Sequence, residues 1–311
     1  MRVSVPPIKC QGIKTKLVPL IKQMADWNCT GTWIEPFTGS GVVGFNLAPR
    51  RALFTDTNPH TIALFKALQS SEITPAIIRE FLQKEGNTLA QNGESHYYDI
   101  RTRFNKYGSS LDFLFLNRAC FNGLIRFNRK GGFNVPFCRK PNRFAPAYIT
   151  KIVNQAISLR HRMQLSDWEF RVQDFSATIE TATAADFIYA DPPYVGRHVD
   201  YFDSWDEIKE SELFRLLNST SAKFILSTWE ENTYRRNAFI DNLWGKFPRV
   251  TQEHFYHVGA NEENRNAMTE ALVMNFQPPY IERSIIKETV KVTNPSLFDM
   301  DVSATHEMQS V

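Results

Sequence analysis

The order of strands and helices along the chain constrains its fold more than any other feature. Residues 31–48 predict an apolar strand, a glycine-bearing turn and a helix, and residues 52–69 predict a second strand, ending at Asp56, and a second helix. This order is typical of the opening of a nucleotide-binding α/β sheet. The pattern stops near residue 70 and resumes near 165, with strands expected at 168–174, 185–191 and 222–228. We therefore expect one sheet, built from two stretches of chain, with a second unit inserted between them.

The inserted stretch is predicted to be mainly helical. Residues 71–107 have helical patterning with a break at "QNGES", and residues 147–165 predict a further helix. Between them, a buried apolar run at 111–123 leads into a loop rich in glycine, asparagine and basic residues.

After the last core strands, residues 211–220 predict a helix, and residues 253–259 and 269–276 predict an antiparallel pair. We expect a discontinuous core domain at residues 1–70 and 165–280, with an inserted lobe at 71–164. Residues 281–311 are expected to form a polar, poorly ordered tail.

Positive charge is concentrated in the inserted stretch. Residues 100–160 contain twelve Lys and Arg but one acid, Asp112, so this segment carries +11 while the rest of the chain carries −8. Such asymmetry favours a lobe that binds a polyanion beside a neutral or acidic lobe.

Other bulk features narrow the class of protein. No run of about 18 apolar residues is present, so no membrane span is expected, and the first residues lack the apolar region of a secretion signal. The four cysteines have no metal-binding spacing, which indicates reduced thiols and no metal site. These features predict a cytoplasmic protein.

The turn "EPFTGSG" at residues 35–41 is the first candidate site. Gly39 and Gly41 permit positive φ angles and close approach of the backbone to a ligand. The turn matches neither glycine pattern that binds phosphate, so a cofactor without phosphate, such as S-adenosylmethionine, fits better. The free N–H groups at the start of the following helix would bind the cofactor carboxylate, Glu35 would hold its amino group indirectly, and Asp56 would bind the ribose hydroxyls. A turn kept only for tight packing, with Asp56 as a helix cap, is the alternative.

The second candidate site is "DPPY" at residues 191–194, directly behind the apolar run "ADFIYA". Ligands of open α/β sheets bind beyond the carboxyl ends of strands. Asp191 and the carbonyl of Pro192 offer two acceptors, and Tyr194 offers a ring, which together suit an amine on a planar base. The polarised amine would attack the cofactor's methyl group directly. A proline-rich turn with no chemical role is the alternative.

The third candidate site is the segment 117–144, in which phenylalanines alternate with Arg, Lys, Asn and Gly. Asparagine and arginine read base edges, and lysine and arginine contact phosphates. A solvated basic loop is the alternative, although such a loop has no need of five phenylalanines.

Five separated segments together resemble the Dam-type (D12 class) adenine-N6 DNA methyltransferases. They are "PPIKCQGIKTKL", "EPFTGSG", "TDTNPH", "FLFLNRACFNGLIRFNRKGGFNVPF" and "DPPY", in this order, and they are most similar to the DpnII-type methylase, which modifies GATC. The resemblance spans residues 6 to 276. It implies an α/β fold, namely the Rossmann-like sheet of S-adenosylmethionine-dependent methyltransferases with an inserted, mainly helical DNA-recognition lobe that contains a β-hairpin loop.

The resemblance also implies roles for individual residues. By this resemblance, Arg126 of this chain would read a guanine through O6 and N7, and Pro136 would contact a thymine methyl group. Many relatives have tryptophan at the position of Cys10, so this contact departs from the family pattern. The implied catalytic residues are Asp191, Pro192, Pro193 and Tyr194. The implied cofactor-binding residues are Cys10, Lys14, Glu35, Phe37, Gly39, Gly41, Asp56, Asp174, Phe175 and Asp191. The implied DNA-binding residues are Lys9, Arg118, Asn122, Leu124, Arg126, Asn128, Pro136 and Lys140.

The expected function is transfer of a methyl group from S-adenosylmethionine to N6 of adenine in duplex DNA, within GATC, after the base swings out of the helix. The expected protein is a bacterial or phage-encoded monomer. A cognate restriction endonuclease would be a partner in function, not a stable subunit. Cytosine-N4, RNA or protein-glutamine methylation, and non-catalytic DNA binding, are alternative functions. The large basic insert favours nucleic acid over protein as the substrate.

Overall fold

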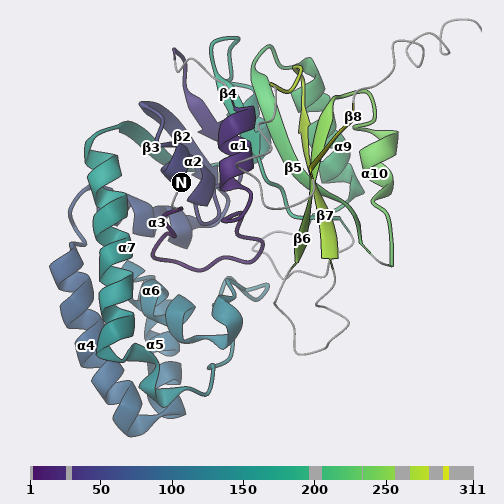
Figure 1. Cartoon of the computed structure of the whole chain (residues 1–311). Helices are drawn as coiled ribbons and strands as arrows, with labels where there is room; N and C mark the ends of the chain where they lie inside the picture. Colours follow the sequence, from purple (N-terminus) through teal and green to yellow (C-terminus); the bar gives the residue numbers. More distant parts are fainter. Residues whose placement is uncertain are drawn as a thin grey trace, which may run out of the picture.

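The computed structural model describes residues 3–25, 30–195, 205–232, 234–255, 267–279 and 290–293. Its centre is an eight-stranded sheet in the order β3-β2-β1-β4-β5-β7-β6-β8 (Figure 1). The strands are β1 (Trp33–Glu35), β2 (Arg51–Asp56), β3 (Asp167–Val172), β4 (Phe187–Ala190), β5 (Lys223–Asn232), β6 (Arg249–Phe255), β7 (Ala267–Met274) and β8 (Val290–Thr293). The Rossmann-like α/β fold expected from the sequence is confirmed.

The direction of the strands fixes where a ligand can bind. Strands β1 to β5 are mutually parallel, whereas β7 runs antiparallel to both β5 and β6. The chain leaves β1 toward β2 and β3 on one side and later returns to β4 on the other. The sheet therefore reverses its order between β1 and β4, and the carboxyl ends of these two strands flank the crevice where such sheets bind ligands.

Alternation along the strands divides the core between the two faces of the sheet. Along β4, Phe187 and Tyr189 belong to one hydrophobic cluster, and Ile188 and Ala190 belong to the other. Strands buried on both faces read as continuous apolar runs, as this one does. The first face is covered by α1 (Val18–Met24), α2 (Val42–Leu47), α3 (Pro59–Gln69) and α7 (Pro146–Gln164), and the second by α8 (Phe175–Ile179), α9 (Glu207–Ser219) and α10 (Ala238–Asn242).

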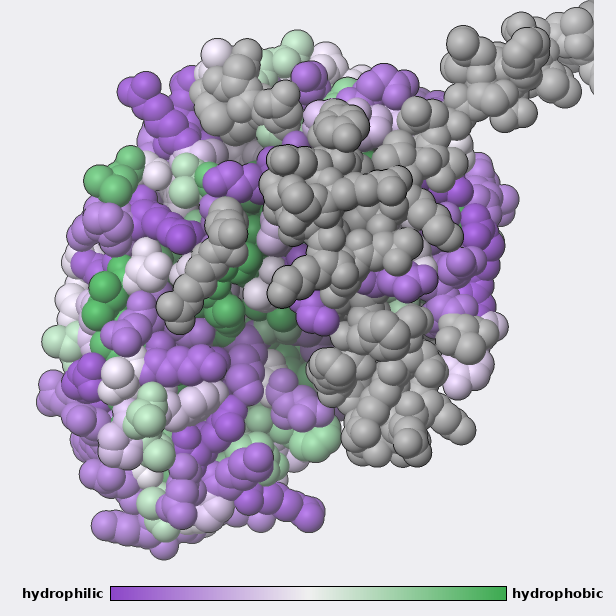
Figure 2. All heavy atoms as spheres, in the orientation of Figure 1, coloured by the Kyte–Doolittle hydropathy of each residue, from purple (hydrophilic) through white to green (hydrophobic). Residues whose placement is uncertain are grey.

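The inserted lobe is helical, as predicted. It contains α4 (Pro75–Asn92), α5 (Glu94–Tyr107) and α6 (Ser110–Ala119), and α7 returns from it to β3 (Figure 1). The expected break at "QNGES" lies at Gly93, whose φ of 62° ends α4 and starts α5. Figure 2 shows mostly hydrophilic residues on the visible face of this lobe. The proposed domain limits after residues 70 and 164 fall in connections between elements and stay a prediction, because one hydrophobic cluster spans both units.

The C-terminal part of the described chain adds antiparallel strands to the sheet. The predicted polar tail contains a strand, because β8 pairs with β6 over four residues; the other residues beyond 279 lie outside the described part of the chain. The expected antiparallel pair is confirmed as β6 and β7, with the predicted positions 256–259 outside the described residues. Among the described residues, no helix combines the length and the apolar character needed to cross a membrane.

Candidate active site and DNA-facing loop

The glycine turn after β1 lies at the reversal point of the sheet. Gly39 has a φ of 48° and Gly41 a φ of 69°, both in the left-handed region that favours glycine. A Cβ atom on Gly41 would lie 2.3 Å from the ring of Phe45. The turn therefore needs glycine at residue 41 for two independent reasons, its backbone angle and its packing.

The N–H groups of this turn are bonded within the protein. Gly39 donates to Asp56 Oδ2 at 2.8 Å, and Val42 donates to Ser40 Oγ at 3.3 Å. The Ser40 N–H bonds the thiol of Cys10, whose pKa is raised to about 12, chiefly by burial. The expected contact of the cofactor carboxylate with the N–H groups at the start of the following helix stays a prediction. The turn itself holds Asp56 and Cys10 in place at the reversal point.

Glu35 is buried next to the glycine turn and bonds residues on both sides of it. Its side chain is 2% exposed, Oε1 accepts from the indole Nε1 of Trp33 at 2.8 Å, and the Gly44 N–H also bonds the carboxyl. Burial raises the pKa of Glu35 to about 8, so the carboxyl is protonated at neutral pH. Glu35 thus fixes the turn through Trp33 and Gly44, and its indirect role in holding the cofactor's amino group stays a prediction.

The residues expected to bind the cofactor include Asp56 and two aromatic rings, Phe37 and Phe175, which pack with Trp205. Asp56 Oδ1 accepts from the Asn58 N–H at 2.9 Å. The ring of Phe37 stacks on Phe175 with centroids 5.4 Å apart, and Trp205 meets Phe37 edge-on at 5.3 Å. Sequence reasoning missed Trp205, because it precedes α9 in no recognisable motif.

Asp174 differs from its neighbour Phe175. Asp174 is exposed and caps α8, with Oδ1 accepting from Ser176 N at 2.9 Å and from Ser176 Oγ at 2.8 Å. Its role in binding the cofactor therefore stays a prediction, whereas Phe175 lies in the aromatic group described above.

The segment "DPPY", residues 191–194, follows β4 directly, as predicted. Lys14 Nζ lies 2.9 Å from Asp191 Oδ1, and the Lys14 side chain is 4% exposed. Burial raises the pKa of Asp191 to about 6; the Lys14 ammonium opposes this shift and the Glu270 carboxylate adds to it. Pro192 is buried and Pro193 is half-buried. The structure thus joins Lys14, expected only at the cofactor, to Asp191, whose catalytic role stays a prediction.

Tyr194 is anchored more firmly than the sequence suggests. It is 8% exposed, it packs in one cluster with Trp229 and Met268, and its hydroxyl lies 2.6 Å from Glu270 Oε2. Lys14 Nζ lies 5.0 Å from the centre of the tyrosine ring. Sequence reasoning missed Glu270, for which the signal was a lone carboxylate in the apolar run "AMTEALVM".

The loop between α6 and α7 contains the expected hairpin. Antiparallel bridges join Cys120 to Phe137 and Phe127 to Phe133. Arg126 is held at the hairpin, with Nε donating to Asn134 Oδ1 at 2.8 Å. This bond fixes the position of the Arg126 side chain, which is half-buried.

The other residues predicted to contact DNA from this loop differ in exposure. Asn122, Asn128 and Pro136 are exposed, and Leu124 is half-buried. Asn122 has a φ of 53°, a backbone angle that asparagine tolerates better than most residues. Asn128 Oδ1 accepts from the N–H groups of Lys130 and Gly132, so this side chain shapes the turn.

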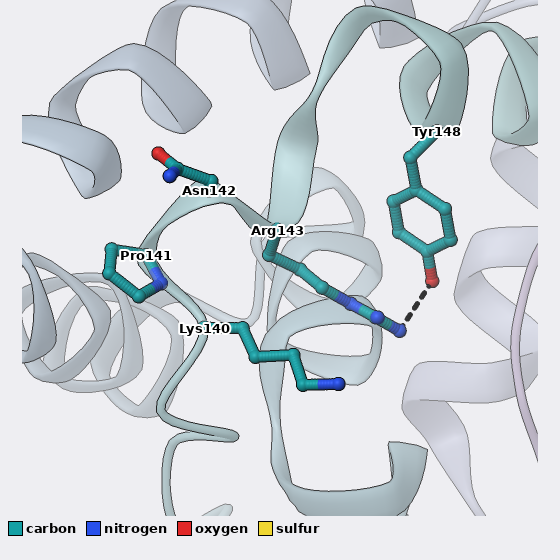
Figure 3. Close-up of a pocket in the computed structure, with 5 residues that line it drawn as sticks. All are labelled: Lys140, Pro141, Asn142, Arg143 and Tyr148. Atoms are coloured by element: carbon teal, nitrogen blue, oxygen red, sulfur yellow. Dashed lines mark hydrogen bonds between the residues drawn. The ribbon is translucent and has the colours of Figure 1, made fainter.

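A basic pocket lies beside the hairpin. It has a volume of about 450 Å³ and is lined by Lys140, Pro141, Asn142, Arg143 and Tyr148. Figure 3 shows the guanidinium of Arg143 directed at the hydroxyl of Tyr148, with Nη2 and the oxygen 2.7 Å apart. Sequence reasoning included Arg143 in the basic segment 117–144 but did not single it out among the DNA-binding residues.

Arg118 is not placed as expected. It is 3% exposed on α6, Nη2 donates to Gln155 Oε1, and its guanidinium lies 5.3 Å from the Tyr148 ring. Burial, together with the charge of Arg143, lowers its pKa. The expected direct DNA contact is therefore wrong for this conformation. Arg118 is buried and packs on the ring of Tyr148, which lines the pocket.

Lys9 links the N-terminal segment to the lobe. Its N–H donates to Asn117 Oδ1 at 2.7 Å, while its side chain packs on Gly123 and stays half-buried. Burial and the charges of Arg143 and Arg118 lower its pKa. Lys9 thus lies in the same cationic region as the pocket.

In the part of the chain that the structure describes, no group of His, Cys, Asp and Glu is arranged to hold a metal ion. Cys10, Cys120 and Cys138 are free thiols.

Comparisons with known proteins agree with this geometry. The family described as D12 class N6 adenine-specific DNA methyltransferase matches residues 11–261. The type II methyltransferase M.MjaIII of Methanocaldococcus jannaschii is 27% identical over 301 residues, covering 87% of this chain and 99% of that protein. The DNA adenine methylase of Haemophilus influenzae is 33% identical over 197 residues, covering 61% and 63%.

Among solved structures, the rRNA methyltransferase aviRa of Streptomyces viridochromogenes aligns over 84% of each chain, with 14% identity and a TM-score of 0.34. That likeness is too low to carry an argument. The family match spans well over half of the chain and includes both the glycine turn and the motif after β4. The chain therefore belongs to the D12 class of N6 adenine-specific DNA methyltransferases, enzymes that use S-adenosylmethionine to methylate adenine in DNA.

Proposed function

We propose that this enzyme methylates N6 of adenine within GATC in duplex DNA, as a monomer that acts on one strand at a time. The observation that carries the choice of sequence is the hairpin of residues 126–134. It holds Arg126 by its bond to Asn134 on an otherwise exposed cationic loop. Arginine is the side chain that most often reads a guanine bidentately, through O6 and N7.

In this proposal the adenine leaves the helix, because no methyl donor can reach N6 inside a stacked duplex. The exposed part of the loop at Phe121 and Asn122 fills the gap that the base leaves; Phe121 is 47% exposed. An exposed ring beside a strained asparagine suits insertion into a base stack.

At the end of β4, the Asp191 carboxylate accepts a hydrogen bond from the amino group of the extruded base. Lys14 is bonded to Oδ1, so the proposed acceptor is Oδ2. The carboxylate is ionised above pH 6, where it can accept but is too weak a base to remove a proton from the free amine. It directs the nitrogen lone pair at the methyl carbon. Once the nitrogen has gained the methyl group and a positive charge, its acidic N–H proton passes to the carboxylate and from there to water.

S-adenosylmethionine, when bound, supplies an electrophilic methyl group on a sulfonium. The residues proposed to hold it are Phe37, Asp56, Phe175 and Lys14, with Glu35, Gly39, Gly41 and Cys10 fixing the turn. Tyr194 stacks on the extruded base. Because Lys14 lies over the tyrosine ring, the base must take the opposite face or displace the ammonium.

The test is methyl transfer from labelled S-adenosylmethionine to matched duplexes that contain GATC or the same bases in another order. We expect N6-methyladenine in the GATC duplex and resistance of that duplex to a nuclease that methylation blocks. Equal labelling of both duplexes, labelled cytosine, or transfer to RNA alone would refute the proposal. Light scattering on the complex with DNA tests the monomer.

A further inference from the structure

The hydroxyl of Tyr194 is bonded to a carboxylate that no motif includes. Tyr194 Oη and Glu270 Oε2 are 2.6 Å apart and both are buried. Glu270 is 1% exposed and lies within β7, where Trp229 of β5 and Gln252 of β6 are its partners in the sheet. The acid therefore approaches the catalytic motif from the antiparallel part of the sheet, 76 residues further along the chain.

Packing alone does not explain an acid at this position. Its neighbours along β7 include Met268, Ala271, Leu272 and Val273, all buried and apolar. Placing a carboxylate among them carries a desolvation cost, and an apolar residue of similar size is often as stable or more so. A short bond from a phenol to a carboxylate is charge-assisted, which offsets part of that cost and fixes both groups in one geometry.

We propose that Glu270 is a positioning residue for methyl transfer: it fixes the ring plane of Tyr194 and keeps the phenol hydroxyl away from the amine acceptors of the catalytic motif. The second effect follows from chemistry, because a free phenol hydroxyl beside Asp191 could donate to that carboxylate and occupy the place of the substrate amine. The inference depends on the proposed stacking role of Tyr194. It adds that the orientation of the ring is set from β7.

The charge on Glu270 also acts on Asp191, whose pKa it helps to raise. The positioning effect and the charge effect can be separated by substitution. Glu270→Gln removes the charge but keeps an oxygen that accepts from the tyrosine, whereas Glu270→Ala removes both. Tyr194→Phe removes the hydroxyl and keeps the ring.

A double-mutant cycle tests the proposal by single-turnover kinetics, on whichever adenine duplex the wild-type chain methylates, so a wrong recognition sequence leaves this test intact. With Tyr194 present, Glu270→Ala should lower the rate of methyl transfer about 10- to 100-fold, as small misplacements of reacting groups do, with little change in cofactor affinity. With Phe at position 194, the same change should cost no further rate when measured near pH 8, because the positioning route is gone and Asp191, with a pKa of about 6, is already ionised there. Glu270→Gln should restore most of the rate.

A matched control is Glu85→Ala. Glu85 is a buried acid on α4, 6% exposed and paired with His96 at 2.8 Å, so its loss should lower Tm without lowering the methyl-transfer rate below Tm. The proposal is overturned if Glu270→Ala slows transfer equally with Tyr194 and with Phe at that position. It is also overturned if Glu270→Ala leaves the rate unchanged, or if Glu270→Gln is as slow as Glu270→Ala at equal Tm.

Discussion

The carboxyl end of β4 and the loop between α6 and α7 handle charge in opposite ways. At β4, Lys14 meets Asp191 at 2.9 Å, and the hydroxyl of Tyr194 meets Glu270 at 2.6 Å. Around the loop, residues 100–160 carry twelve basic side chains against one acid, Asp112, and Arg103 Nε already bonds that acid at 2.9 Å.

The difference indicates which region is complete by itself. The end of β4 is largely buried and internally paired, although 22% of the Asp191 side chain is exposed. Its geometry is therefore largely set before any substrate arrives, as electrostatic preorganisation requires. The loop has an excess of cations that a polyanion would neutralise. Substitutions at β4 should therefore change the chemical step, whereas substitutions in the loop should change binding and sequence choice.

The largest expected effect is that of Asp191→Ala. Removing the acceptor should lower the single-turnover rate by at least about 10²–10³-fold, the usual loss for one group aimed at developing charge. DNA affinity, measured by fluorescence anisotropy, should stay close to that of the wild type. A variant that lost binding along with activity would show that the two regions are not separate.

Arg126→Ala should have the next largest effect, on sequence choice. Loss of a bidentate contact should reduce discrimination at the guanine by about 1–3 kcal/mol. Competition between GATC and a duplex altered at the guanine measures this loss. Arg129→Ala, an exposed arginine of the same hairpin, is the matched control and should leave discrimination intact. Equal weakening on all duplexes would instead make Arg126 a phosphate contact.

The two cases show what could be predicted from the sequence. Apolar runs, the glycine turn and the acidic strand ends predicted the sheet and the position of Asp191 correctly, because these signals are local. The bond from Tyr194 to Glu270 is not local, and one carboxylate in an apolar strand gives no hint of its partner. Arg118 has the sequence surroundings of a DNA contact, yet α6 is buried along most of its length, so it lies inside.

The pH dependence of the methyl-transfer rate should follow the ionisation of Asp191. Its pKa is raised to about 6, and the ionised form is the acceptor, so the rate should fall about tenfold per pH unit below 6 and level off above it. Lys14→Met removes the cation that lowers this pKa, so the acid limb should move to higher pH. A limb near pH 4, or a shift to lower pH in the Lys14 variant, would contradict the charge arrangement at β4.

The smallest effect should come from the pocket beside the hairpin. Arg143→Ala removes a cation that lines it, so affinity should fall by a similar factor on every duplex, and the salt dependence of binding should lose about one unit of slope. Lys66→Ala, an exposed lysine of α3 outside the lobe, serves as control and should leave the slope unchanged. A change in sequence preference would place Arg143 at a base edge instead.

The central claim is that the paired residues at the end of β4 act on an adenine that has left the helix. The direct measurement places 2-aminopurine at the target position of a GATC duplex and follows its fluorescence on binding to the Asp191→Ala variant. We predict a strong rise in fluorescence without methyl transfer to the matching adenine duplex, because extrusion depends on the loop and chemistry on Asp191. Unchanged fluorescence on saturated binding, for both this variant and the wild type, would contradict the account.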